Sequence, residues 1–336
     1  MCGKLGKNLF RYRCDTSFIV LSFSTMIHVE ENVDLHSFTT FRVGGKTRFF
    51  FRATSEQDLL DGFKWANQNN EPVFVLGGGS NVLFSDRGWE GLVIKMECVD
   101  MREVAPGQLS VGAGASLHAL LEYAKEHGLS GLERLAGIPG TVGGAVRGNA
   151  GAFGAETAQA VASVRILDRR TLTFEHRERA ACEFRYRSSL FKQHPEYVVV
   201  SAHFLLQPGA DPAVLERIMR ETIATREQKH PQRLLCAGSF FMNPPVKDAR
   251  LREEFEKETG MVVKDEKLPA GWLIDYVGLR GKQIGGARVS DIHPNYLLNV
   301  GTATAENILI LASVVKQKVR SELGIILREE VQMVGF

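Results

Sequence analysis

Hydrophobic and polar positions change period several times along this chain, and the changes separate strands from helices. Residues 47–53 and 73–76 are short runs of apolar and β-branched side chains, which predict two strands. Between them, apolar residues recur over 59–66 with helical spacing. Thr54 and Gln57 precede that segment in the spacing of a capping box. The pattern therefore predicts a strand–helix–strand unit.

The same reasoning predicts mixed strands and helices through the rest of the chain, and so the α+β class. Ser116 is expected to cap a helix that Gly128 ends. Further strands are predicted near 92–95, 109–113, 162–168 and 198–206, and a final one over 325–334. Helices are predicted at about 212–228, ended by His230–Pro231, at 250–259, ended by Gly260, and at 304–323, with Gly324 beyond it.

Two glycine clusters stand out from this pattern. The first follows the strand at 73–76 and reads GGGSN over 77–81, where several free backbone N–H groups could hold a phosphate. A plain tight turn would explain it equally well. No lysine follows as in a P-loop, and Val82 stands where a Rossmann fingerprint has its third glycine. The second cluster begins at Gly137 and has no two glycines two positions apart, so any dinucleotide would bind outside a Rossmann fold.

Charge and cysteine content narrow the setting. The 336 residues carry 41 Lys and Arg against 39 Asp and Glu, a net charge of +2, so nothing favours nucleic acid or a membrane surface. The five cysteines form no CxxC pair, which argues against a disulfide framework or a metal site and favours the cytoplasm. No apolar run reaches membrane-spanning length. Residues 1–25 are expected to be a dispensable extension, since no cleavage site follows their short apolar run.

The glycine clusters belong to longer motifs that resemble one known family. These motifs are TTFRVGG at 39–45, VLGGGSNVLFSD at 75–86 and GIPGTVGGAVRGNAGAFGAE at 137–156. They are similar to the UDP-N-acetylenolpyruvoylglucosamine reductase (MurB) family, and the similarity runs from Thr39 to Gly335. It implies a two-subdomain FAD-binding fold of the vanillyl-alcohol-oxidase (PCMH) type, followed by an α+β substrate domain. The expected division is 1–25 for the extension, 26–95 and 96–208 for the two FAD-binding subdomains, and 209–336 for the substrate domain.

The resemblance also implies the ligands. FAD is expected to bind noncovalently, because residues 77–81 contain no histidine for attachment, and NADPH is the expected reductant. The implied FAD-binding residues are Gly77, Gly78, Gly79, Ser80, Asn81, Ile138, Pro139, Gly140, Thr141, Gly144 and Tyr186. No metal is implied. The expected partners are a UDP-sugar and NADPH, with no nucleic acid or membrane, and the chain is expected to be a monomer.

Three residues in matching motifs are implied to be catalytic. They are Arg187 in FRYRSSLF, Ser239 in AGSFFMNP and Glu330 in LREEV. Hydride transfer to an enolpyruvyl double bond builds enolate charge beside a carboxylate, which arginine can hold. A hydroxyl such as Ser239 can protonate the other carbon, and Glu330 can orient the intermediate or relay a proton. Taken singly, each residue has an ordinary reading, as a surface salt bridge, a turn or cap serine, or a solvated strand carboxylate.

Substrate contacts and rival functions are less constrained. The resemblance implies substrate binding by Arg226, Lys229, Asn243 and Gln283. Ser239 follows Arg187 by only 52 positions (239 − 187), so the tyrosine-bearing loop of one form of the family is absent, yet 245–268 resembles an insertion of that form. Met242 stands where the family usually has lysine. Two alternatives stay open: an FAD oxidase or dehydrogenase acting on another hydroxy acid or sugar, and a nonenzymatic flavin- or nucleotide-binding module.

Overall fold

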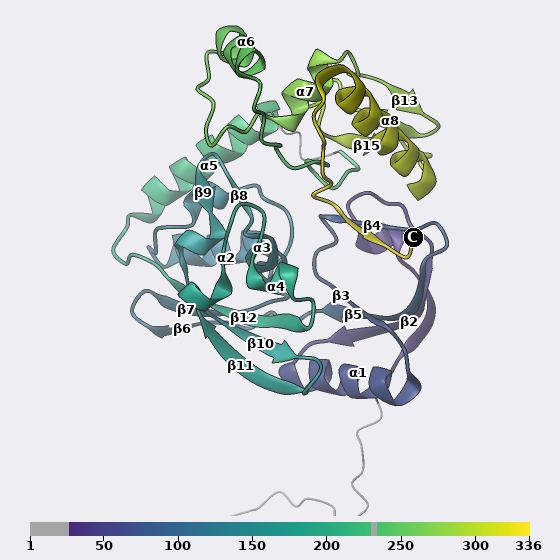
Figure 1. The fold of residues 1–336 in the computed structure, drawn as a ribbon. Helices are drawn as coiled ribbons and strands as arrows, with labels where there is room; N and C mark the ends of the chain where they lie inside the picture. Colours follow the sequence, from purple (N-terminus) through teal and green to yellow (C-terminus); the bar gives the residue numbers. More distant parts are fainter. Residues whose placement is uncertain (1–26, 230–233) are drawn as a thin grey trace, which may run out of the picture.

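The structure, a computed structural model, describes residues 27–229 and 234–336 and is drawn in Figure 1. The expected extension at 1–25 and the expected helix stop at His230–Pro231 fall outside these residues. Strands and helices are mixed along the chain, and the predicted α+β class is confirmed. Within the described ranges, no helix combines the length and apolar character that crossing a bilayer requires.

The first sheet has four strands, three of them parallel. In spatial order they are β1 (Glu30–Asp34), β2 (Lys46–Ala53), β5 (Trp89–Met96) and β3 (Val73–Leu76). β1 alone pairs antiparallel, with β2. Helix α1 (Glu56–Asn69) joins β2 to β3 and buries Leu59, Phe63 and Ala66, as the spacing predicts.

The predicted capping box of α1 is wrong by one position. Ser55 is the N-cap: its hydroxyl accepts a hydrogen bond from the Asp58 N–H at 3.1 Å. The Asp58 carboxylate accepts in turn from the N–H groups of Thr54 and Ser55, both at 3.0 Å. An aspartate at the third helical position can thus close the box as well as the Glu or Gln on which the prediction relied.

The second sheet has five antiparallel strands. In spatial order they are β11 (Thr173–Glu178), β10 (Val161–Asp168), β12 (Tyr197–Leu205), β7 (Gln108–Gly112) and β6 (Met101–Ala105). The sequence did not predict β11 and β6. They are the two edge strands and bury almost no side chains, so they lack the apolar pattern that reveals the inner strands.

Short helices and strands, joined by loops, connect the two sheets and lie near the glycine clusters. α2 (Leu117–Glu126) starts at its predicted cap, Ser116, whose hydroxyl accepts from the Ala119 N–H at 3.0 Å. The remaining elements of this region are η1 (His36–Phe38), η2 (Glu133–Leu135), α3 (Val142–Gly148), β8 (Gly151–Ala152), β9 (Ala155–Glu156), η3 (Thr157–Gln159), η4 (Arg179–Cys182) and α4 (Leu190–Gln193). One continuous core joins α1, α2 and both sheets, so the two expected FAD-binding subdomains are packed against each other.

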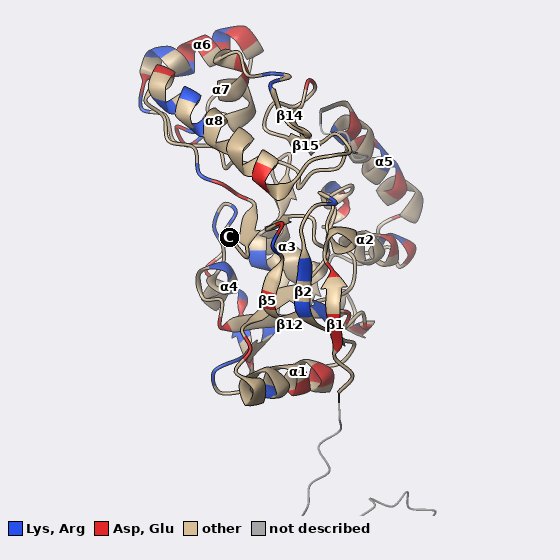
Figure 2. Cartoon of the chain, turned by 90° about the vertical axis from the view of Figure 1, so that its right-hand side faces the viewer, with Lys and Arg blue, Asp and Glu red and all other residues tan. Residues whose placement is uncertain are grey.

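The last part of the chain forms a smaller unit, at the top of Figure 1. It contains a three-stranded sheet and three helices with their own core. They are α6 (Ala249–Thr259), α7 (Ala270–Tyr276), β13 (Gln283–Ile284), β14 (Ala287–Val289), β15 (Leu297–Asn299) and α8 (Ala305–Leu323). The predicted glycine stops are confirmed at α6 and α8, where Gly260 and Gly324 have left-handed backbones. Charges of both signs are interspersed along α6, which buries only Leu251 and Phe255 (Figure 2).

The chain end returns to the first sheet region. β16 (Gln332–Val334) pairs in parallel with β4 (Val82–Phe84), and Val334 joins the core of the first sheet. The predicted strand over 325–334 was therefore too long. Its first seven residues bury Leu327 and Val331 in the C-terminal core, where hydrophobic packing without a strand ladder gives the same apolar pattern.

Further contacts fix the C-terminal unit on the first. Asp86 accepts from two backbone N–H groups at the start of α8, those of Ala305 at 2.8 Å and Glu306 at 2.9 Å. The Asn299 amide donates to the Phe41 carbonyl at 3.0 Å, and Phe41 lies in the C-terminal core. The two units are therefore joined by buried contacts as well as by the chain.

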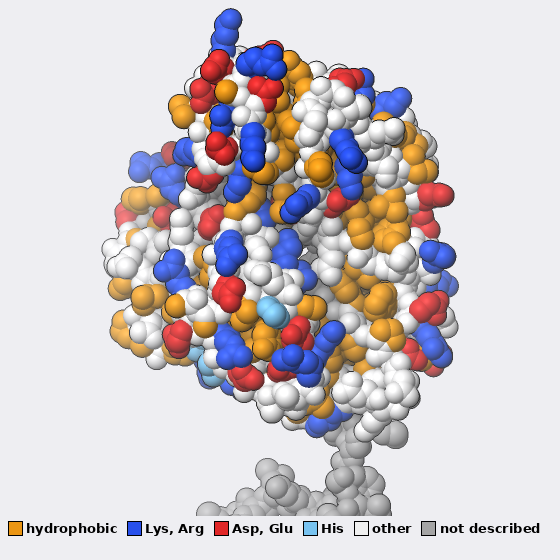
Figure 3. Space-filling model, viewed as in Figure 1, with side chains coloured by type: hydrophobic (Ala, Val, Ile, Leu, Met, Phe, Trp, Pro, Cys, Tyr) orange, Lys and Arg blue, Asp and Glu red, His pale blue; other side chains and the backbone are white. Residues whose placement is uncertain are grey.

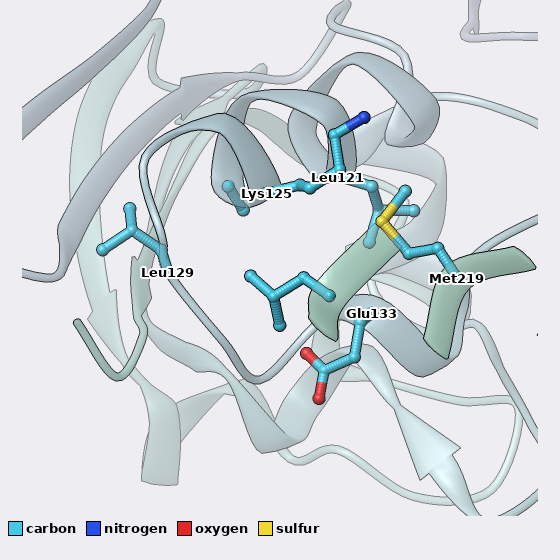
Figure 4. Close-up of a pocket in the computed structure, with 7 residues that line it drawn as sticks. Leu121, Lys125, Leu129, Glu133 and Met219 are labelled. Carbon is cyan, nitrogen blue, oxygen red and sulfur yellow. The ribbon is translucent and has the colours of Figure 1, made fainter. Parts of the chain in front are cut away.

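Helix α5 (Pro212–Lys229) packs on the second subdomain. It lies against α2 and η2, and Met219 belongs to the shared core of the two sheets. A pocket between α2 and α5, drawn in Figure 4, has a volume of only about 10 Å³. That is room for one water at most, so we interpret it as a packing gap. The domain boundaries stay predictions, and the packing of α5 favours a boundary after this helix instead of at 208/209.

Candidate active site

The two glycine clusters, 60 positions apart, lie directly against each other. A Cβ on Gly78 would stand 2.8 Å from the Gly140 Cα, and a Cβ on Gly79, where φ is +65°, would stand 1.9 Å from the Phe38 carbonyl oxygen. The Ser80 hydroxyl donates to the Pro139 carbonyl at 3.3 Å. Only glycine permits this approach, so the clusters form one structure.

The backbone at this junction offers unused hydrogen-bond donors. Within the described residues, the N–H groups of 77–81, Gly140 and Thr141 donate no hydrogen bond. Backbone N–H groups are obligatory donors, and several of them together form an anion-binding nest. Gly144, by contrast, donates to the Thr141 hydroxyl at 3.4 Å and so belongs to the cap of α3.

Two basic residues border the same place, and the sequence reasoning missed both. Lys95, near the end of β5, donates to the Gly77 carbonyl at 2.6 Å, and burial lowers the pKa of its ammonium group. Arg42 donates to the Ser37 carbonyl at 2.9 Å. They line a cavity of about 290 Å³ together with Ser37, Phe38, Thr39, Thr40 and Gly78. A lysine closing the apolar strand WEGLVIKM was the available signal for Lys95.

Unused N–H groups with two flanking cations suit a pyrophosphate, the most charged part of FAD. None of the residues that line the cavity is acidic; they are neutral or basic. The donor set therefore fits the pyrophosphate of a dinucleotide.

Arg187 lies at the tip of a tight turn beside this junction. Arg185 and Ser188 exchange two backbone hydrogen bonds of 3.0 Å across the turn, and Arg187 takes a left-handed backbone with φ of +53°. For a residue with a side chain this conformation costs about 1–2 kcal/mol. Such strain clusters at functional sites.

The guanidinium of Arg187 is held on two sides. Its Nη2 donates to the Gly151 carbonyl at 2.6 Å, and its Nε lies 2.9 Å from the Glu330 carboxylate. The side chains of Arg187 and Glu330 are 22% and 17% exposed. Burial raises the pKa of Glu330, while Arg187 and then Lys192 oppose that rise. Arg187 and Glu330 thus form a largely buried ion pair between distant parts of the chain.

The segment that carries Ser239 is hydrogen-bonded to the segment that carries Glu330. Phe240, the residue after Ser239, accepts from the Glu330 N–H at 2.8 Å, and Met242 donates to the Arg328 carbonyl at 2.9 Å. On the other side, the buried Asn295 exchanges side-chain hydrogen bonds of 2.9 and 2.8 Å with the Phe241 backbone. Asn295 therefore fixes the segment that carries Ser239.

The first glycine loop also reaches this segment. The Asn81 amide donates to the Glu330 carbonyl at 3.1 Å. The structure thus pairs Arg187 with Glu330 next to the loop expected to hold the cofactor, and it hydrogen-bonds the residue after Ser239 to Glu330. Figure 3 shows a hollow near the centre of this face of the molecule, with basic side chains beside it.

Tyr186 and Arg226 lie around the trio. Burial raises the pKa of Tyr186, whose hydroxyl lies against the Asn243 backbone. The Lys267 ammonium, from the 245–268 insertion, lies 4.6 Å from the Tyr186 ring centre. Arg226 is 9% exposed, makes no ion pair with any described residue, and its Nε has no hydrogen-bond partner. Burial lowers its pKa, and its guanidinium lies 5.7 Å from the Phe153 ring centre.

The other expected substrate residues are placed differently. The side-chain Oδ1 of Asn243 accepts from the Ala270 N–H at 3.0 Å, at the first residue of α7. Gln283 is exposed on β13, donates to the Gly285 carbonyl at 2.9 Å, and no contact in the described chain joins it to the trio. The neighbouring Gly286 packs on the backbone before α8, which explains that glycine pair by packing. The end of α5 includes Lys229, whose side chain is outside the description.

Comparison with known proteins identifies the family. The chain is 36% identical over 315 residues to the UDP-N-acetylenolpyruvoylglucosamine reductase of Solibacter usitatus, covering 91% of this chain and 97% of that protein. The chain belongs to the UDP-N-acetylenolpyruvoylglucosamine reductase family. The reductase of Chlamydia trachomatis is also 36% identical, over 92% of this chain and 97% of the relative.

Domain models and a solved structure agree with this membership. An FAD binding domain matches residues 47–173, which include both glycine clusters. The C-terminal domain of UDP-N-acetylenolpyruvoylglucosamine reductase matches residues 230–334, which include Ser239 and Glu330. The crystal structure of the Thermus caldophilus reductase (MurB) superposes with a TM-score of 0.71 at 30% identity, covering 92% of this chain and all of that one. The FAD-binding fold expected from the resemblance is confirmed.

Proposed function

We propose that this reductase-family chain reduces UDP-N-acetylglucosamine enolpyruvate to UDP-N-acetylmuramate with NADPH through bound FAD. The observation that carries the proposal is the convergence of Arg187, Glu330 and the Ser239 segment beside the glycine junction. An FAD oxidase of similar fold would have no need for a buried Arg–Glu pair next to a serine.

The residues that would hold FAD are those of the junction. The N–H groups of 77–81 and of Gly140 and Thr141 are available to the pyrophosphate, with Lys95 beside them. Ile138 and Pro139 border the same junction, and Tyr186 stands on the Arg187 turn. Bound FAD would supply the hydride chemistry, with NADPH as the hydride donor and one carbon of the enolpyruvyl double bond as the acceptor.

Arg187 is proposed to hold the substrate carboxylate and the enolate charge that develops beside it. A guanidinium retains its charge at any physiological pH and offers paired donors to a carboxylate. It is already oriented by Gly151 and Glu330, so little rearrangement is required during the reaction.

Ser239 is proposed to donate the proton that the second carbon must receive. A positioned general acid contributes roughly 10²–10⁴-fold to a rate. Glu330 is proposed to keep Arg187 in place and to orient the intermediate. Arg226 is proposed as a contact for the substrate diphosphate or the nicotinamide nucleotide, since a buried cation with no acid partner among the described residues favours an anionic ligand. Lys229, Asn243 and Gln283, which the resemblance implies, are proposed as further substrate contacts.

The test separates the two halves of the reaction. Anaerobic addition of NADPH to the FAD-loaded protein should bleach the flavin band, and UDP-N-acetylglucosamine enolpyruvate should restore it. In Ser239→Ala, NADPH should still bleach the flavin band, while recovery of the band on addition of the substrate should slow by roughly 10²–10⁴-fold. Ser321→Ala, on the exposed surface of α8, is the control and should recover at the wild-type rate.

Two results would count against the proposal. Bleaching without recovery in the wild type would retain the flavoprotein and reject the substrate. Full recovery in Ser239→Ala would reject the role of the serine alone.

A further inference from the structure

Lys192 is a second cation at the Arg187–Glu330 pair that the proposed reaction does not yet use. It lies on α4, five positions after Arg187, and its ammonium group reaches back to the turn. Its Nζ donates to the carbonyl oxygen of Arg187 at 2.9 Å. Burial lowers the pKa of Lys192, and the charge of Glu330 acts in the opposite direction. A half-buried lysine is thus aimed at the backbone of the residue expected to bind the substrate carboxylate.

The contact acts where the backbone is strained. Arg187 occupies the left-handed region, which a side chain makes unfavourable by about 1–2 kcal/mol. A strained residue keeps one position only if its surroundings fix it. The guanidinium is fixed by Gly151 and Glu330, and the carbonyl is fixed by Lys192. Without Lys192, the Arg187 carbonyl has no other hydrogen-bond partner among the described residues, and only the two Arg185–Ser188 backbone hydrogen bonds close the turn.

The same ammonium group shapes the field at Glu330. The charged and titratable groups that act on this carboxylate are Arg187 and Tyr186 on the turn, Lys192 on α4 and Tyr296 before β15. Arg147 on α3 acts in turn on Lys192. Arg147 forms no ion pair with any described residue, and burial lowers its pKa. Lys192 therefore opposes the burial of Glu330 together with Arg187.

We infer that Lys192 is a positioning residue of the reductase site, which fixes the left-handed backbone of Arg187 and supplies a second positive charge facing Glu330. The inference rests on the proposed function, because it assigns Lys192 a part in the same reaction. It predicts two separable effects, one on the rate and one on the pH at which Glu330 ionises.

Three substitutions separate these effects. Lys192→Met removes the donor and the charge, Lys192→Gln retains an N–H donor without charge, and Lys192→Arg retains the charge. Lys316→Met is the matched control, because Lys316 pairs at 2.7 Å with Glu329, the carboxylate next to Glu330 in sequence. Turnover of UDP-N-acetylglucosamine enolpyruvate by the FAD-loaded proteins is measured from pH 5 to 9, together with anaerobic flavin reduction by NADPH.

The expected outcome is specific to the second half of the reaction. In Lys192→Met, kcat should fall about 10- to 100-fold, as a small misplacement of a substrate-binding group costs. The acid limb of kcat/KM should move up by about one pH unit, since a neighbouring cation lowers a carboxyl pKa by that order. Lys192→Gln should show the same shift with a smaller loss of rate. Lys192→Arg and Lys316→Met should retain the wild-type limb, and flavin reduction should be unchanged in all four.

Several results would overturn the inference. An unshifted acid limb in Lys192→Gln would do so even if Lys192→Met failed to fold. An equal shift in Lys316→Met would assign the effect to general surface charge, and parallel loss of flavin reduction would assign it to structural damage. Absence of turnover in the wild type would refute the proposed function itself, whereas normal wild-type turnover with an unshifted limb would refute the role of Lys192 alone.

Discussion

Replacing Arg187 by methionine removes the partner of a buried carboxylate, and the cost should depend on pH. Glu330 is 17% exposed, and its pKa is already raised by burial. Loss of Arg187 raises that pKa further, because Arg187 is the stronger of the two cations that oppose burial. The folded protein then takes up a proton at pH values where the unfolded chain does not.

The sign and size of the effect follow from that difference. At pH values between the pKa of Glu330 in the unfolded chain and its pKa in the folded Arg187→Met variant, only the folded state binds the proton. The free energy of unfolding of the variant therefore falls as pH rises, by up to about 1.4 kcal/mol per pH unit. Below the unfolded pKa, Glu330 is neutral in both states and the substitution should cost only about 1 kcal/mol for the lost hydrogen bonds. At pH 8 we expect about 3 kcal/mol, the range found when one partner of a buried pair is removed.

Urea denaturation at pH 5, 6, 7 and 8 would measure this. FAD should be kept at one saturating concentration, because a ligand bound by the folded state adds stability by mass action. Arg185→Met is the control: its side chain is 72% exposed, 4.0 Å from Glu183, and such pairs contribute about 0–1 kcal/mol at any pH. If the gap between Arg187→Met and wild type stayed constant from pH 5 to 8, the proposed buried pairing with Glu330 would be wrong.

Two further predictions concern the frame of the site. Asp86→Ala removes the acceptor of two N–H groups of α8 and should lower the free energy of unfolding by about 1–2 kcal/mol, with Asp86→Asn recovering part of it in urea denaturation. Gly78→Ala places a Cβ 2.8 Å from the Gly140 Cα, so the purified protein should contain much less FAD by its visible spectrum. Gly148→Ala, which meets no atom within 4 Å, should retain the wild-type content, and equal FAD in both variants would contradict the idea of a tight glycine junction.

The sequence predicted those parts of the fold that carry their own local signal. The helices at 117–126, 249–259 and 305–323 combine an apolar face with a cap or a glycine stop, and their ends were found within one or two residues. The edge strands β6 and β11 were missed, because exposed strands have no apolar period. The final strand was drawn too long, because apolar residues that pack in a core resemble those of a strand.

The sequence by itself determined that the glycines occur in two clusters and which family the motifs resemble, whereas the close approach that requires glycine there was visible only in the fold. Tertiary structure alone decided that Arg187 meets Glu330, 143 positions away (330 − 187), and that Lys95 closes the glycine junction. It also decided that the Asn243 side chain accepts a hydrogen bond from the first residue of α7 and that burial raises the pKa of Glu330. Local patterns depend on neighbours along the chain, whereas pairing, burial and pKa depend on what the fold brings near and on the water it excludes.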